Sequence, residues 1–127
     1  MGATVIQNKL YVTDYGNNRV LAYNLPISSN APSASRVVCQ SSFTTATSGD
    51  SLSSCSVPWG VGSDGTRLFV SDYNNNRILV WNSLPTADGV AADIVLGQSG
   101  PSVTKEFGPT ANRFGIASTS YLHTLKF

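Results

Sequence analysis

The chain has 127 residues, which is enough for one domain, and only 12% of them are charged. Its net charge of +1 and its single glutamate, Glu106, argue against a nucleic-acid partner and against a helical bundle. No apolar run is long enough to span a membrane and the first residues show no export signal, so no membrane partner is expected.

An internal repeat organises the chain. Residues 10–24 read LYVTDYGNNRVLAYN, and residues 68–82 read LFVSDYNNNRILVWN, at an offset of 58 residues. At the same offset Gly2 pairs with Gly60, and ASRVVCQ pairs with ADIVLGQ further along. A third copy begins with FGIAS at residues 114–118 and then runs out.

Taken in chain order, the second copy predicts four strands. A short strand near residues 61–62 leads to Asp64-Gly65, a dipeptide that favours a tight primed hairpin turn. The β-rich strand RLFVSD follows, and Asn74 and Asn75 tolerate the left-handed conformation expected at the next turn. The strand RILVWN, a looser connection and the strand DIVLGQ complete the unit.

The second and third strands of each unit are almost continuously apolar, a pattern typical of strands covered on both faces. Stacked copies of the same sheet would provide that cover. The predicted fold is therefore all-β, with consecutive four-stranded antiparallel sheets. The expected division of residues 1–127 is unit 1 over about 2–40, a loop at 41–57, unit 2 over about 58–98, a loop at 99–113, and a partial unit 3 over about 114–127.

The repeated tract resembles the blades of NHL-repeat β-propeller proteins, and the tail NSLPTADGVAADIVLGQ is similar to a longer bacterial subtype. The residues that carry the resemblance are Asp14, Asn18 and Arg19 in the first copy, and Asp72, Asn76 and Arg77 in the second. The resemblance implies consecutive propeller blades in an incomplete ring, because closing a ring takes about four to eight blades. The chain would then be a piece of a longer propeller, a unit that assembles in several copies, or an open stack. The expected partners are further blades, in the same longer chain or in other copies.

For function, the resemblance implies a non-catalytic binding or scaffold module that recognises a protein or a small ligand. One alternative is a fragment of a propeller enzyme, a lyase or hydrolase whose catalytic residues lie in other blades. Another is an RNA-binding propeller, which the low net charge disfavours. No catalytic constellation, cofactor or metal site is expected, since the single histidine, His123, lacks the companions that a zinc site needs.

In a four-stranded meander the turn between the second and third strands shares one end of the sheet with the long connections 41–57 and 99–113. Long ordered loops on a rigid scaffold frequently carry binding groups. The predicted recognition residues at this end are Tyr15, Asn17, Phe43, Tyr73 and Asn75.

Two other sets of residues admit a structural and a functional interpretation. The pairs Asp14–Arg19 and Asp72–Arg77 are either structural clasps across a turn, which their repetition favours, or an ionic lining for a ligand. The aromatic residues Trp59, Trp81, Tyr23 and Phe114 either fill the core between blades, which their matched positions favour, or form a stacking platform.

Cys39 and Cys55 bracket a Ser/Thr-rich segment, and their aligned positions in the second copy, Gly97 and Thr110, lack both thiols together. They are either a disulfide or two small buried apolar residues. A bonded pair would favour an extracellular or periplasmic location, and the sequence leaves the localisation otherwise open.

Overall fold

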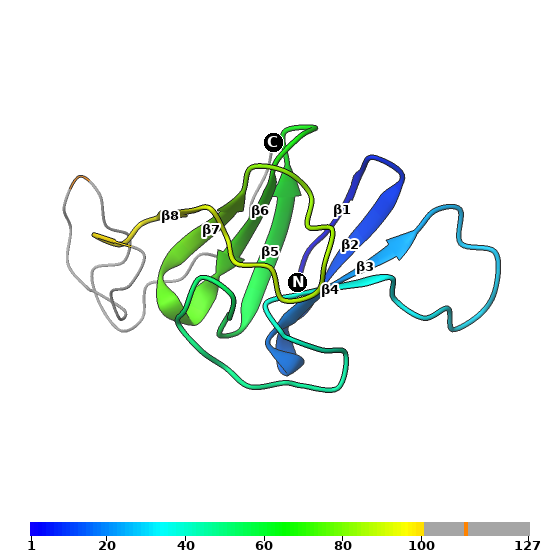
Figure 1. Ribbon diagram of the computed structural model, residues 1–127, viewed down its shortest axis with the longest axis horizontal. Helices are drawn as coiled ribbons and strands as arrows, with labels where there is room; N and C mark the ends of the chain where they lie inside the picture. Colours follow the sequence, from blue (N-terminus) through cyan, green and yellow to red (C-terminus); the bar gives the residue numbers. More distant parts are fainter. Residues whose placement is uncertain (101–110, 112–127) are drawn as a thin grey trace.

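The computed structural model describes residues 1–100 and residue 111, and these residues fold into two four-stranded antiparallel sheets (Figure 1). The first sheet has the order β1 (Ala3–Ile6), β2 (Lys9–Asp14), β3 (Arg19–Asn24) and β4 (Arg36–Val38). The second has the order β5 (Pro58–Ser63), β6 (Leu68–Asp72), β7 (Arg77–Trp81) and β8 (Ile94–Leu96). The predicted all-β class is confirmed, and the described residues form no closed ring. The expected partial unit at 114–127 lies outside the described residues.

The predicted two-residue primed turn at Asp64-Gly65 is wrong. Ser63 pairs with Leu68, so the connection is longer, and only Gly65 has a positive φ, of 100°. The Asp64 carboxylate causes the difference, because its Oδ1 accepts the backbone N–H of Thr66 at 3.0 Å and that of Arg67 at 2.8 Å. A two-residue turn with positive φ at both positions occurs instead at residues 7–8 of the first sheet.

The turn between the second and third strands of each sheet is a short 3₁₀ helix, η1 (Tyr15–Asn17) or η2 (Tyr73–Asn75). The residue that follows each helix is left-handed: Asn18 at φ 54° and Asn76 at φ 51°. The prediction placed that conformation at Asn74 and Asn75, which is wrong. The left-handed residue is the one whose N–H closes the turn, onto Tyr15 O at 3.1 Å and onto Tyr73 O at 3.2 Å.

The two sheets pack face to face, with β5 of the second sheet against β1, β2 and β3 of the first (Figure 1). Strand register places Tyr11 opposite Ala22 on the covered face of the first sheet. We call this face, with Tyr11, Thr13, Val20 and Ala22, the inner face. Its apolar members share one buried core with four residues of the second sheet, Leu68, Val70, Leu79 and Trp81.

The approach of the two sheets depends on a glycine. A Cβ atom at Gly2 would lie 3.0 Å from the backbone nitrogen of Val61, so a larger residue would push the sheets apart. Gly2 N donates to Thr13 Oγ1 at 2.8 Å, and the same hydroxyl lies 3.3 Å from the carbonyl oxygen of Trp59. Gly60 and Ser71 repeat the first of these contacts within the second sheet, at 2.7 Å.

Coverage differs between the sheets. In the first sheet the side chains alternate, with Tyr11, Val20 and Ala22 buried and those of Leu10 and Leu21 half-buried. Within the described part of the chain, the first sheet therefore has a covering sheet on one face and not on the other. In the second sheet β6 and β7 are buried except for Phe69 and Ile78, which are half-buried.

The segment between the sheets is tied to β4 by a disulfide between Cys39 and Cys55, whose Cα atoms are 5.3 Å apart. The connection from β7 to β8 in turn covers the edge of β4. Its Gly89 N–H donates to Val37 O at 3.3 Å, and Asp88 Oδ1 lies 3.0 Å from Arg36 Nη1. Strand β4 therefore has β3 on one side and the β7–β8 connection on the other. Its edge is covered and not open to pairing with another strand.

Among the described residues, no helix has the length and apolar character needed to cross a membrane.

The phenol of Tyr11 is buried at the interface between the sheets, and its oxygen has no hydrogen-bond partner. Burial raises the pKa of this phenol, and Arg36 partly opposes that effect. Since an unpaired buried hydroxyl costs about 1–3 kcal/mol, Tyr11→Phe should leave the free energy of unfolding unchanged or raise it by about 1 kcal/mol. Urea unfolding followed by circular dichroism measures this, and a loss above about 1 kcal/mol would show that the hydroxyl is bonded.

Removal of the disulfide by Cys39→Ala together with Cys55→Ala should lower the free energy of unfolding by about 3 kcal/mol, because it frees the closed loop in the unfolded chain. Cys39 has a φ of 71°, and its counterpart Gly97 has a φ of 95°. Cys39→Gly with Cys55→Ala should therefore be more stable than the alanine pair by about 1 kcal/mol. Denaturant unfolding of the three proteins side by side decides both points.

Candidate functional site

Each sheet holds the turn after its second strand with the same side-chain network, which we call the clasp. In the first sheet the Asp14 carboxylate accepts hydrogen bonds from the side chains of Asn17 and Arg19. Asn17 Nδ2 lies 3.0 Å from each carboxylate oxygen, and Arg19 Nε lies 2.6 Å from Oδ2. The Arg19 side chain is 18% exposed and that of Asp14 is 28% exposed, so this clasp is in partial contact with water.

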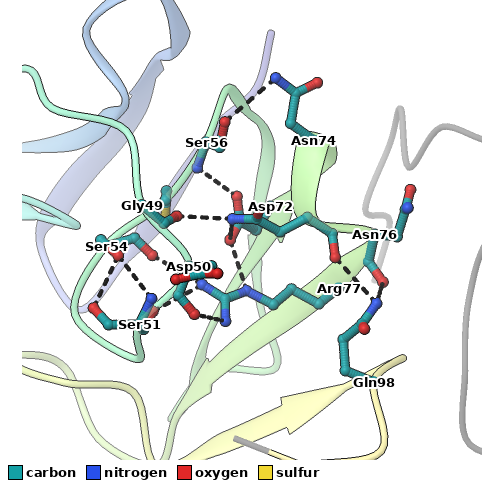
Figure 2. A network of polar contacts seen from close by, with 12 residues as sticks. Gly49, Asp50, Ser51, Ser54, Ser56, Asp72, Asn74, Asn76, Arg77 and Gln98 are labelled. Carbon is teal, nitrogen blue, oxygen red and sulfur yellow. Dashed lines mark hydrogen bonds and ion pairs between the residues drawn. The ribbon is translucent and has the colours of Figure 1, made fainter. Parts of the chain in front are cut away.

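The clasp of the second sheet is buried. Figure 2 shows how Asp72 and Arg77 lie in it. Asp72 Oδ2 accepts from Asn75 Nδ2 at 2.8 Å and from Arg77 Nε at 2.7 Å, and Oδ1 accepts the N–H of Ser56 at 2.7 Å. The side chains of Arg77 and Asp72 are 2% and 0% exposed. Burial raises the pKa of Asp72, while Arg77 and the hydrogen bonds from Asn75 and Ser56 act in the opposite direction.

The clasps fasten the segment between the sheets, residues 41–57, which we call the strap. Arg77 binds its second half, since Nη1 donates to Asp50 O at 2.6 Å and Nη2 donates to Ser51 O at 2.8 Å and Ser54 O at 3.1 Å (Figure 2). Asn75 Nδ2 adds a bond of 2.8 Å to Gly49 O. The terminal nitrogens of the Arg77 guanidinium are therefore hydrogen-bonded to backbone carbonyls. In this arrangement Arg77 supports the strap structurally.

The first sheet binds both ends of the strap. Arg19 Nη1 donates to Phe43 O, and Asn18 Nδ2 donates to Ala46 O at 2.9 Å. Asn18 Oδ1 accepts the N–H of Val57 at 2.9 Å, directly before β5. One asparagine thus positions the beginning and the end of the strap relative to its own sheet.

A glutamine at the end of each unit completes the network. Gln40 Nε2 donates to Asn18 O at 2.9 Å and to Thr47 O at 2.8 Å. Its counterpart Gln98 donates to Asn75 O at 3.1 Å and to Asn76 O at 2.9 Å. Both glutamines satisfy carbonyls at the end of the 3₁₀ turn, which a buried turn requires.

Three aromatic rings from both sheets meet at this same end, and we call them the aromatic row: Tyr15, Trp59 and Tyr73. The ring centroids of Tyr15 and Trp59 are 5.3 Å apart with the planes at 50°, and those of Trp59 and Tyr73 are 5.7 Å apart at 32°. Tyr15 is 40% exposed and the other two are half-buried. The row combines apolar ring surface with hydroxyl groups, and Tyr15 is its exposed member.

The other predicted recognition residues lie elsewhere or are already bonded. Phe43 is exposed, but it lines a hollow with Leu21 and Tyr23 on the first sheet. The amide nitrogens of Asn17 and Asn75 donate to the clasp carboxylates. The structure therefore brings together Tyr15 and Tyr73 from the predicted set, and adds Trp59.

The sequence interpretation assigned Trp59 to core filling between blades. A usable signal is that Trp59 aligns with Met1 in the first copy, so it has no aromatic counterpart there. Trp81, in the same predicted group, is buried and donates from Nε1 to Val90 O at 2.9 Å. Tyr23 is half-buried, and Phe114 and His123 lie outside the described residues.

The strap also borders an open hollow of about 400 Å³ lined mainly by Ser and Thr residues. Its hydroxyls bond to one another, as Ser51 Oγ does with Ser54 Oγ at 2.9 Å and with Ser53 Oγ at 3.2 Å. Residues 1–100 contain no group of three His, Cys, Asp or Glu side chains that would hold a metal ion.

No protein-family model matches the chain, and neither the curated proteins nor the solved structures include a match to it.

The two clasps provide a matched experiment, because the same motif is buried in one sheet and partly exposed in the other. Arg77→Ala leaves the Asp72 carboxylate buried without its partner and should lower the free energy of unfolding by about 3–5 kcal/mol. Arg19→Ala should cost clearly less, since water reaches Asp14. Chemical denaturation compares them, and equal losses would show that burial does not set the strength of the clasp.

Proposed function

We propose that this chain is a non-catalytic binding or scaffold module built from NHL-type propeller blades. It recognises a protein or a small ligand at the end of the sheets where the strap lies. The observation that carries this proposal is the aromatic row, in which Tyr15 of one sheet and Tyr73 of the next meet on Trp59. Three rings contributed by two repeats form a surface that neither repeat has alone.

The support for blades is the meander order of both sheets and the packing of the second sheet on the first through β5. The clasp, the left-handed asparagine and the closing glutamine recur at matched positions in both sheets. A unit that repeats its own scaffold in this way is suited to addition of further units. Further blades, in a longer chain or in other copies, are therefore the proposed structural partners.

Binding at this end is supported by a backbone that side-chain hydrogen bonds hold in place beside the exposed ring of Tyr15. The clasps and the strap hold the backbone around the row through side-chain bonds to carbonyls, as at Arg77 and Asn18. Fixed aromatic rings bind apolar, flat partners with little loss of conformational entropy on binding. The face of a sugar ring and a proline-containing peptide both present such surfaces.

Replacement of Tyr15 and Tyr73 by alanine should weaken that binding. The probes are an immobilised glycan panel and a library of proline-containing peptides, screened with the unaltered 127-residue chain. Any probe that binds should lose at least tenfold in affinity with Tyr15→Ala/Tyr73→Ala, about 1.4 kcal/mol or more. It should keep its affinity with Ile27→Ala, which changes an exposed apolar residue on a different loop. Unchanged affinity in a folded double variant would remove the aromatic row from the proposed function.

A further inference from the structure

The last strands of the two sheets, β4 and β8, are equivalent, and one of them has a partner that the other lacks. Their register is the same, because Val37 pairs with Leu21 and Val95 pairs with Leu79. The β7–β8 connection covers the side of β4 that faces away from β3. We call the side of β8 that faces away from β7 the β8 edge. Among residues 1–100, no strand or connection is hydrogen-bonded to it.

The covered edge of β4 is held through both backbone groups of one residue. Val37 N–H donates to Asp88 Oδ1 at 3.1 Å, and Val37 O accepts the N–H of Gly89 at 3.3 Å. Alternate residues of an edge strand point their backbone groups toward and away from the neighbouring strand, and Val37 is one that points away. A carboxylate followed by a backbone N–H therefore complements such a residue.

The position after the carboxylate requires glycine. Gly89 has a φ of 67°, a conformation that residues with a side chain rarely adopt. A Cβ atom there would also lie 3.1 Å from Gln40 O and 3.1 Å from Ser41 Cα. The connection thus binds the edge of β4 with the dipeptide Asp-Gly.

The β8 edge presents the same backbone groups. Val95 has the register position of Val37, so its N–H and C=O point away from β7. Its neighbours Ile94 and Leu96 are 40% and 43% exposed, whereas Val37 is 0% exposed. An exposed apolar edge strand is a template for pairing, and proteins usually cover it. The β8 edge therefore has the binding groups of the β4 edge without the segment that binds them.

We propose that the β8 edge binds an extended segment that carries the dipeptide Asp-Gly and belongs to a further repeat unit. The aspartate carboxylate of that segment accepts the N–H of Val95, and the glycine N–H donates to Val95 O. This is recognition by addition to a sheet edge, in which main-chain groups supply the affinity. The inference rests on the proposed function in one respect, namely that further units add to this chain.

The two edges differ in one contact, which sets the selectivity. At β4, Arg36 Nη1 lies 3.0 Å from Asp88 Oδ1, and the residue of β8 in the register position of Arg36 is Ile94. The N–H of Val95 would therefore bind the carboxylate without that ion pair. Because an amide oxygen also accepts an N–H, asparagine can replace the aspartate at the β8 edge.

The test is a titration of the isotope-labelled 127-residue chain with the end-blocked peptide TADGVAA, residues 86–92 of this chain, up to its solubility limit. Nuclear magnetic resonance should show that the amide signal of Val95 shifts and that of Val37 does not. Peptides with Asp88→Ala or Gly89→Ala should bind at least about tenfold more weakly. The Asp88→Asn peptide should keep its affinity within about twofold, because its amide oxygen still accepts the N–H.

Two variants of the protein form a matched pair. Val95→Pro removes the N–H that points away from β7 and should abolish peptide binding, whereas Val95→Ala keeps that N–H and should bind. Circular dichroism checks that both are folded, and the peptide variants decide the question if Val95→Pro is not. Tyr15→Ala/Tyr73→Ala should leave peptide binding at Val95 unchanged, so failure here and failure of the aromatic row are read separately.

A Val95 amide signal that stays in place up to the solubility limit would overturn the proposal. Shifts confined to Val37 would place the peptide on β4, and equal affinity of the Asp88→Ala and Gly89→Ala peptides would remove the recognition of Asp-Gly. Either result overturns the proposal as well. A dimer of the unaltered chain that Val95→Pro abolishes and Val95→Ala keeps would make a second copy the occupant and overturn the further repeat unit.

Discussion

Burial of one sheet face against the next is the interaction on which this structure depends. A four-stranded meander has two faces, and neither sheet has a core of its own. The buried cluster forms only where Leu68, Leu79 and Trp81 of one sheet meet Tyr11 and Val20 of the other. Apolar area removed from water drives that contact, and antiparallel pairing within each sheet supplies the flat surfaces that make it.

The polar networks follow from this packing. Stacking brings the strap to the ends of the strands, and its carbonyl groups there need donors once water is excluded. Arg77 and Asn75 supply them from the second sheet, and Asn18 supplies them from the first. The charge of Arg77 is balanced by Asp72 on the same turn, so the buried guanidinium brings its own counter-ion. The aromatic row lies at this end because η1, η2 and the start of β5 are fastened to each other there.

Much of the fold could be predicted because the repeat fixed which segments are equivalent and because strands alternate with turn residues. The left-handed positions could not, since consecutive asparagines such as Asn74, Asn75 and Asn76 tolerate that conformation equally, and only the bond that closes the 3₁₀ turn selects one. The turn at Asp64 depended on a side-chain bond that spacing does not reveal. For the candidate site, the sequence predicted the end of the sheets at which the aromatic row lies, and it named both tyrosines of the row. It favoured core filling over a stacking platform for Trp59, because the contact of Trp59 with Tyr15 joins segments far apart in the chain. The cysteine pair stayed open because separation in sequence does not fix a distance between Cα atoms.

The two copies of the clasp have the same ion pair in different surroundings, so they show how the surroundings alone change its burial. Asp14 and Arg19 make the same bond as Asp72 and Arg77, yet only the second pair is buried. The difference comes from what lies beside each sheet, not from the motif. Stability in a stack of similar units is the sum of the units and of the contacts between neighbours. A sheet with one covered face therefore opens more readily than a sheet between two neighbours. On this reasoning any partner that covers the face of the first sheet with Leu10 and Leu21, which has no partner sheet among residues 1–100, stabilises that sheet by mass action.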